Sequence, residues 1–85
     1  MAWEVRLTSA AEADLTALDN AVAARVVEKI ESAATNPHHF FERLRGSEYR
    51  KLRVGDYRII ALFIHQDDVI EIQRIEHRSR VYGRS

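Results

Sequence analysis

The sequence predicts a small α+β domain, because its apolar residues follow the period of a strand at the start, of helices in the middle and of strands at the end. The expected element order is β-α-α-β-β-β. In this fold an antiparallel sheet carries a helical hairpin packed on one face. With 85 residues the chain has room for one hydrophobic core, so we expect a single domain over residues 1–85.

The first strand and both helices are expected before residue 37. Residues 3–7 alternate apolar and charged side chains, as a half-buried strand does. The run from Ser9 to Glu12 reads as a capping box that begins the first helix, and Asp19 can cap a second helix that ends before Pro37. The expected inner stripes are Ala11, Leu15 and Leu18 in the first helix, and Val22, Val26, Val27, Ile30 and Ala34 in the second.

Three further strands are expected over residues 49–54, 57–64 and 69–77. Gly55 and Asp56 form the turn between the first two, and residues 65–68 form the turn between the last two. Such short connections make consecutive antiparallel hairpins. Residues 38–47 show no sustained period and are expected to form a loop, with Leu44 anchored in the core.

Composition excludes several classes of protein. The chain has no cysteine, so disulfides, thiol catalysis and cysteine-bound metals are excluded, and a reducing cytosol suits it. The N-terminus has no charged leader followed by an apolar stretch, and the longest apolar run, Ile59 to Ile64, is too short to span a bilayer. We therefore expect a cytoplasmic protein.

The net charge of zero hides a polarised chain. Residues 1–41 hold three basic and six acidic residues, which gives −3, whereas residues 42–85 hold ten and seven, which gives +3. Most of the later bases are arginine, whose planar fork fits phosphate. An anionic partner is one interpretation, and a solvated strand surface is the other.

Strand register gathers some of these bases on one face. If Gly55 and Asp56 form a two-residue turn, Arg53 lies directly opposite Arg58. Because side chains alternate, the face under the helices receives Leu52, Val54, Tyr57, Ile59, Ala61 and Phe63, and the other face receives Tyr49, Lys51, Arg53 and Arg58. The same alternation through the second turn puts Ile70 and Ile72 on the core face, and Glu71, Gln73, Ile75 and His77 with the bases.

Two opposed arginines repel each other, so stability alone does not favour this cluster, and an anionic ligand would neutralise it. RNA cleavage without a metal needs a base for the 2′-hydroxyl, cations for the phosphate and an acid for the leaving oxygen. Lysine, arginine, histidine and tyrosine can supply all three. Crowding by Arg53 and Arg58 disfavours the charged form of Lys51, which makes a neutral lysine base conceivable.

Several segments resemble the RelE branch of the RelE/ParE toxin superfamily, over nearly the whole chain. They are Leu44 to Gly46, Lys51 to Ile60, His77-Arg78 and Val81-Tyr82. The resemblance implies a ribosome-dependent mRNA endonuclease without a metal or other cofactor, kept silent by a bound antitoxin.

The resemblance also implies roles for single residues. Lys51 matches a lysine that serves as base or charge stabiliser, and Arg58 and Arg78 match arginines that bind the scissile phosphate. Tyr82 matches a tyrosine that stacks on a base, and Arg53 matches an ancillary phosphate contact. Tyr49 and His77 stand where the best-known members have lysines, so His77 is either a proton-transfer group or a phosphate or stacking contact.

Two alternatives remain open on the same fold. One is a ParE-like inhibitor of DNA gyrase, and the other is a catalytically decayed RNA-binding member, which the neutral net charge favours. A metal site at His38, His39 and Glu42 is not expected, because adjacent histidines in a loop point in different directions and no further ligand completes a shell.

Overall fold

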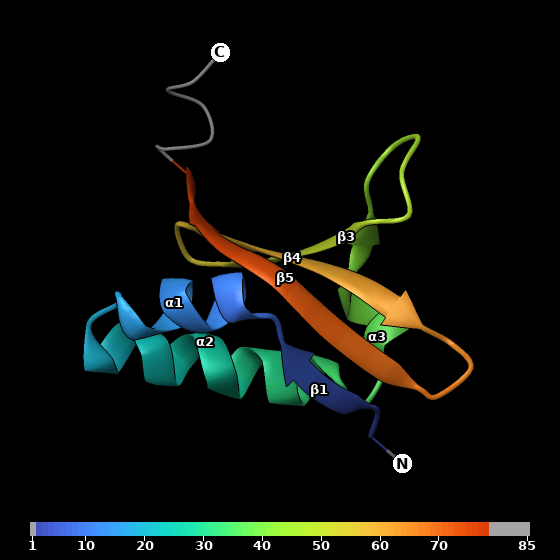
Figure 1. Cartoon of the computed structure of the whole chain (residues 1–85), viewed down its shortest axis with the longest axis horizontal. Coiled ribbons are helices and arrows are strands. Elements are labelled where there is room, and N and C mark those ends of the chain that lie inside the picture. Colours follow the sequence, from blue (N-terminus) through green and yellow to red (C-terminus); the bar gives the residue numbers. More distant parts are fainter. Residues whose placement is uncertain (1, 79–85) are drawn as a thin grey trace.

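The computed structural model describes residues 2–78, and this part of the chain forms a five-stranded sheet with helices on one side (Figure 1). The predicted α+β class is confirmed. The elements in chain order are β1 (Glu4–Leu7), α1 (Ser9–Thr16), α2 (Asn20–Ala33), α3 (Pro37–Phe40), β2 (Glu42–Arg43), β3 (Arg50–Val54), β4 (Tyr57–Ile64) and β5 (Val69–His77). None of the helices within residues 2–78 has the length and apolar character needed to cross a bilayer.

Two short elements, α3 and β2, occupy the segment that was predicted to be a loop. Pro37 begins α3, a position that suits proline because the first helical N–H has no acceptor. Phe41 follows and is 3% exposed, so it anchors this segment in the core, whereas Leu44 is only partly buried. Both elements are too short to produce a periodic pattern in the sequence.

The strand order in the sheet is β1-β5-β4-β3-β2. The pairings of β3 with β4 and of β4 with β5 are antiparallel, as predicted, and the unpredicted β2 also pairs antiparallel with β3. The sheet is not wholly antiparallel as predicted, because β1 runs parallel to β5. These two strands lie at opposite ends of the chain, and the helices return the chain between them (Figure 1). The sequence period predicts the strands but not this relative direction.

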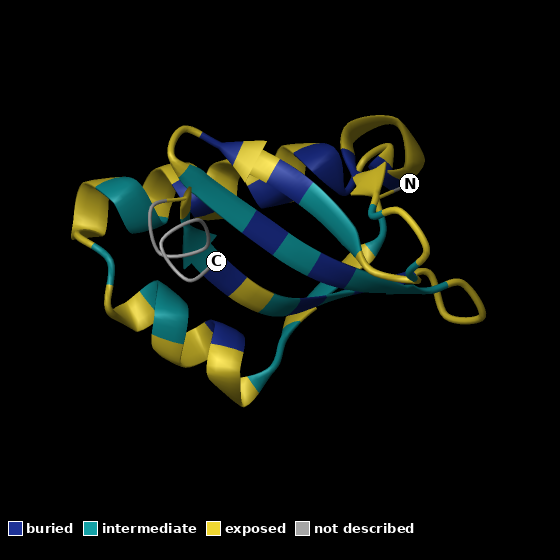
Figure 2. Ribbon diagram, turned by 90° about the horizontal axis from the view of Figure 1, so that it is seen from above, coloured by how far each residue is buried: buried dark blue, intermediate teal, exposed yellow. Residues whose placement is uncertain are grey.

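The core lies between the sheet and the helices. Ile59, Ile70 and Ile72 from the sheet and Val26 from α2 have no exposed surface. Figure 2 shows the resulting alternation of buried and less buried residues along the strands. Val27 is 37% exposed, so its predicted place in the inner stripe of α2 was wrong: it follows Val26 by one position and lies on the flank of the helix.

The caps of the two long helices differ from expectation in detail. Thr8, not Ser9, caps α1, because its Oγ1 accepts a hydrogen bond of 3.1 Å from the Ala11 N–H. Asp19 is the N-cap of α2 as predicted, but its side chain makes no capping hydrogen bond.

A β-bulge interrupts the pairing of β4 with β5. Ile60 pairs with Arg74, whereas Ala61 pairs with Ile72, so Gln73 is an extra residue on β5. Thr8, which directly follows β1, stabilises the bulge, because its Oγ1 donates a hydrogen bond of 3.0 Å to the Gln73 carbonyl. An extra residue moves every later side chain to the opposite face.

The bulge overturns two predicted placements. Ile75, 5% exposed, pairs with Ile59, and His77 pairs with Tyr57, so both lie on the core face rather than with the bases. Arg74 and Glu76 take their places on the other face, which the described helices leave uncovered. We call this the open face, defined by Glu42, Lys51, Arg53, Arg58, Ile60, Leu62, Glu71, Arg74 and Glu76.

Asp14 of α1 fastens the part of β5 that extends beyond β1. Its Oδ2 accepts hydrogen bonds from the Ile75 N–H at 2.9 Å and from Arg74 Nε at 2.8 Å. The hydrogen bond to Asp14, followed by Coulombic attraction to it, raises the pKa of Arg74 above its ordinary value. This carboxylate therefore supplies the partner that a neighbouring strand would otherwise provide to the Ile75 N–H.

Replacing Asp14 by alanine is expected to lower the free energy of unfolding by about 1–3 kcal/mol, because the Ile75 N–H loses its acceptor. Asp19→Ala is the matched control. It removes an equal charge from an N-cap that makes no side-chain bond, and should change stability by less than about 0.5 kcal/mol. Urea unfolding of both variants measures the difference, and equal losses would contradict the role of Asp14.

Candidate functional site

The open face carries charged side chains in rows that cross the strands. One row consists of Arg53 on β3, Arg58 on β4 and Glu76 on β5. The opposition of Arg53 and Arg58 predicted from the two-residue turn is confirmed. The next row consists of Glu42, Lys51, Ile60 and Arg74. The bases thus lie together, but each row also contains an acid.

Arg58 lies at the centre of the first row with a carboxylate beside it. Its Nη2 is 3.6 Å from Glu76 Oε1, and the two side chains are 31% and 32% exposed. Its Nε is buried and has no hydrogen-bond partner in the described part of the chain. Because the side chain is partly exposed and its contact with Glu76 is longer than a hydrogen bond, the guanidinium can still donate to an anion.

Lys51 has an acidic neighbour of its own. Its Nζ is 3.8 Å from Glu42 Oε1, across the pairing of β3 with β2. Lys51 therefore has an acid beside it on β2, in addition to the arginines of the neighbouring row.

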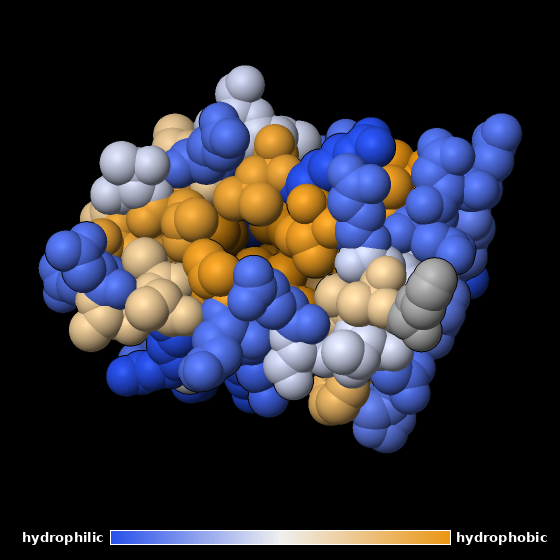
Figure 3. All heavy atoms as spheres, turned by 90° about the horizontal axis from the view of Figure 1, so that it is seen from below, coloured by the Kyte–Doolittle hydropathy of each residue, from blue (hydrophilic) through white to orange (hydrophobic). Residues whose placement is uncertain are grey.

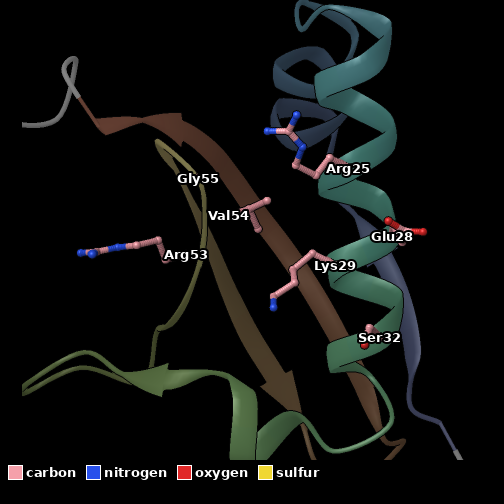
Figure 4. Close-up of a pocket in the computed structure, with 7 residues that line it drawn as sticks. All are labelled: Arg25, Glu28, Lys29, Ser32, Arg53, Val54 and Gly55. Atoms are coloured by element: carbon pink, nitrogen blue, oxygen red, sulfur yellow. The ribbon is translucent and has the colours of Figure 1, made fainter.

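Arg53 is exposed, and no ion pair to it is found within residues 2–78. In Figure 4 its side chain points away from α2, while Lys29 extends from α2 toward β3. An open groove of about 570 Å³ lies between the two elements. Its lining residues are Arg25, Glu28, Lys29, Ser32, Arg53, Val54 and Gly55. Because β2 pairs only with Arg50 and Lys51 of β3, basic side chains of α2 and of the later part of β3 line one groove.

His77 does not lie with the bases, and its predicted position was wrong. Its ring packs against Tyr57 at a centroid distance of 5.0 Å, in a hollow lined also by Asp14 of α1 and by Leu18 of the connection between α1 and α2. The bulge at Gln73 turned it to this side of the sheet. A group in this position cannot reach a phosphate held by Arg58 on the opposite face without a rearrangement of β5.

The remaining predicted site residues are Tyr49, Arg78 and Tyr82. Tyr49 immediately precedes β3 and is 43% exposed, so it lies at the surface. The Arg78 N–H donates to the Asp56 carbonyl at 2.7 Å, which holds the end of β5 beside the turn that leads into Arg58. Tyr82 lies outside the described residues.

The histidines in the loop contact aromatic rings. The His38 ring stacks on His65 with centroids 5.1 Å apart, and both rings contact Trp3 and Phe63. His39 packs against Phe40. Within residues 2–78, no three histidine, aspartate or glutamate side chains are grouped so that they could hold a metal ion.

The fold matches solved structures of one class of toxin. A chain of the toxin-antitoxin complex RelBE2 from Mycobacterium tuberculosis matches with a TM-score of 0.85 and 27% sequence identity. The match covers 92% of this chain and 100% of that chain. A chain of the archaeal RelE-RelB complex from Pyrococcus horikoshii OT3 matches with a TM-score of 0.77 and 26% sequence identity. The match covers 94% of this chain and 99% of that chain. The isolated E. coli RelE toxin matches with a TM-score of 0.79 and 20% sequence identity, and the match covers 98% of this chain and 94% of that chain. At this low identity the match shows a shared fold alone.

The fold and these matches define a toxin of the RelE/ParE superfamily, as the resemblance predicted. None of the curated proteins matches the sequence. The model of the ParE toxin of type II toxin-antitoxin systems, parDE, matches residues 5–82. The chain belongs to this family, and it is the toxin of a type II toxin-antitoxin system.

Proposed function

We propose that the toxin is a ribosome-dependent mRNA endoribonuclease that inhibits translation in the cytoplasm. Cleavage proceeds by metal-independent attack of a 2′-hydroxyl on the adjacent phosphate, with Arg58 as the main phosphate-binding residue. Lys51 and Arg53 add positive charge, and Arg78 and Tyr82 complete the site as the family resemblance implies.

The observation that carries this proposal is the opposition of Arg53 and Arg58 on the open face. Like charges directly opposed across two strands weaken a sheet, so a bound anion stabilises this arrangement. The Arg58 side chain is 31% exposed and its 3.6 Å contact with Glu76 is longer than a hydrogen bond, so the guanidinium can donate to phosphate oxygens. A fixed cation beside a phosphate stabilises the charge that grows during attack.

The partner that silences the toxin is a cognate antitoxin, since two of the matched structures are complexes of a toxin with its antitoxin. The side of the molecule opposite the open face suits a protein partner. Figure 3 shows apolar side chains gathered there around a hollow. Leu15, Leu18 and Val22 are only partly buried in this helical layer, and Val27 is exposed. An apolar surface of this kind is stabilised when another chain covers it.

A cell-free translation assay tests the proposed function. Purified toxin is added to bacterial ribosomes programmed with a defined mRNA, and the 5′ ends of the products are mapped. We expect cleavage of ribosome-bound mRNA, with a 2′,3′-cyclic phosphate on the upstream fragment and no cleavage where the attacking 2′-hydroxyl is replaced by hydrogen. Intact mRNA under these conditions would contradict the proposal.

Inhibition of DNA gyrase is the second candidate, because the matching family model is that of ParE. Supercoiling of relaxed plasmid by purified gyrase measures it directly. A block at one toxin per gyrase, together with intact mRNA in the translation assay, would favour this function. Binding to ribosomes with neither activity would instead indicate a catalytically decayed member.

A further inference from the structure

The proposed chemistry needs a group that removes the proton from the attacking 2′-hydroxyl. The displacement of His77 to the core face removes one predicted group from the open face. Lys51 lies one row away from Arg58, with its Nζ 3.8 Å from the Glu42 carboxylate, and its part in the proposed site is to stabilise charge. Among the described residues of the open face, the remaining groups that can accept a proton are carboxylates.

Glu76 is the carboxylate nearest to the proposed phosphate-binding arginine. It lies directly across from Arg58, with Oε1 3.6 Å from Nη2, and no hydrogen bond to its carboxylate is found within residues 2–78. Its side chain is 32% exposed, so an incoming ribose can reach it. The bulge at Gln73 is what turns this side chain toward the bases.

The two other carboxylates of this surface have different surroundings. Glu42 is paired with Lys51 on the far side of β3, where its side chain is 76% exposed. Glu71 accepts a hydrogen bond of 2.8 Å from Gln73 Nε2 and lies across from Leu62, an apolar residue. Neither contacts Arg58, so only Glu76 combines an available carboxylate with the phosphate-binding position.

We infer that Glu76 is the general base of the cleavage reaction, a role that rests on the proposed function. Its carboxylate takes the proton of the 2′-hydroxyl while the 2′-oxygen forms a bond to phosphorus. The bond from phosphorus to the 5′-oxygen breaks, and that oxygen takes a proton from water. The hydroxide left behind removes the proton from Glu76, so the products are a 2′,3′-cyclic phosphate and a 5′-hydroxyl.

The geometry also fits the order of atoms in RNA. The 2′-oxygen belongs to the ribose on the 3′-oxygen side of the scissile phosphate, so it lies beside the phosphorus that it attacks. A carboxylate in contact with the arginine that holds this phosphate is therefore placed near the neighbouring hydroxyl. Arg53 lies across from Arg58 on the side away from Glu76, where the RNA backbone would continue.

The test measures binding and cleavage separately in Glu76→Gln. This variant keeps the shape of the side chain, removes a negative charge from an RNA-binding face and removes the proton acceptor. We expect the single-turnover rate of mRNA cleavage on programmed ribosomes to fall by about 10²–10⁴-fold, whereas affinity for the programmed ribosome stays equal or rises. Glu76→Asp should recover part of the rate. Glu12→Gln, a change of the same kind at an exposed position of α1 outside the open face, should cleave like the wild type.

A substrate with sulfur in place of the scissile 5′-oxygen separates a base from an acid. Sulfur leaves without protonation, so the deficit of Glu76→Gln should persist on this substrate, and recovery of the rate would overturn the assignment. Wild-type rates in Glu76→Gln, or a loss confined to binding, would also overturn it. If the wild type leaves mRNA intact, the proposed function fails and this inference fails with it. Circular dichroism and urea unfolding verify that each variant is folded.

Discussion

Arg58→Ala is expected to lower the rate of ribosome-dependent mRNA cleavage by about 10²–10³-fold, the usual effect of removing one preorganised charge-stabilising donor. Arg58 lies between Arg53 and Glu76, so its guanidinium stands at the centre of the charged row. Alanine removes both the positive charge and the fork that fits phosphate. The remaining cations cannot replace it, because Lys51 is one row away and Arg53 is more exposed.

The loss should occur in the chemical step and not in folding. Single-turnover cleavage on programmed ribosomes measures the rate, and urea unfolding measures stability. Arg58→Lys should retain part of the activity, because it keeps a charge but loses the bidentate geometry. Arg6→Ala is the matched control. It removes the same charge from β1, where Arg6 pairs with Glu4 two strands away from β4, and should leave cleavage unchanged. Equal rates for Arg58→Ala and wild type would contradict the proposed site.

The hairpin of β3 and β4 could be predicted from the sequence because its turn is short and its strands alternate strictly. A two-residue turn at Gly55 and Asp56 fixes the partner of every residue on both strands. Gly55 has φ of +58°, a conformation that glycine adopts readily. The opposition of Arg53 and Arg58 follows directly, and this is the part of the candidate site that sequence reasoning found.

The second half of the site could not be predicted because a single bulge residue reverses the alternation. Strict alternation assigned His77 to the open face and overlooked Glu76 and Arg74. A signal was present in the sequence, since the apolar residues Ile72 and Ile75 are three positions apart instead of two. In a strand with one buried face, an odd spacing between core residues indicates a bulge.

The other features that could not be predicted depend on pairings between segments that are far apart in the sequence. The acid partners of the site come from separate strands, with Glu42 on β2 and Glu76 on β5. The parallel placement of β1 beside β5 likewise depends on how the helices return the chain to the sheet. Local sequence patterns predict the elements but carry no information about which distant strand lies beside which.

Ile59→Ala is expected to lower the free energy of unfolding by about 2–5 kcal/mol, whereas Ile60→Ala should lower it by less than about 1.5 kcal/mol. Ile59 has no exposed surface and pairs with Leu52 and Ile75 inside the core, so truncation leaves a cavity there. Ile60 is its chain neighbour on the open face and is only partly buried.

Urea unfolding of both variants tests the face assignment on which the site depends. A domain of this size has a total stability of about 5–10 kcal/mol, so the loss at Ile59 alone removes a large part of it. Comparable losses at the two positions would contradict the assignment of Ile60 to the open face. Ile60 lies in the row between Lys51 and Arg74, so a folded Ile60→Ala toxin also shows whether the apolar centre of that row takes part in binding RNA.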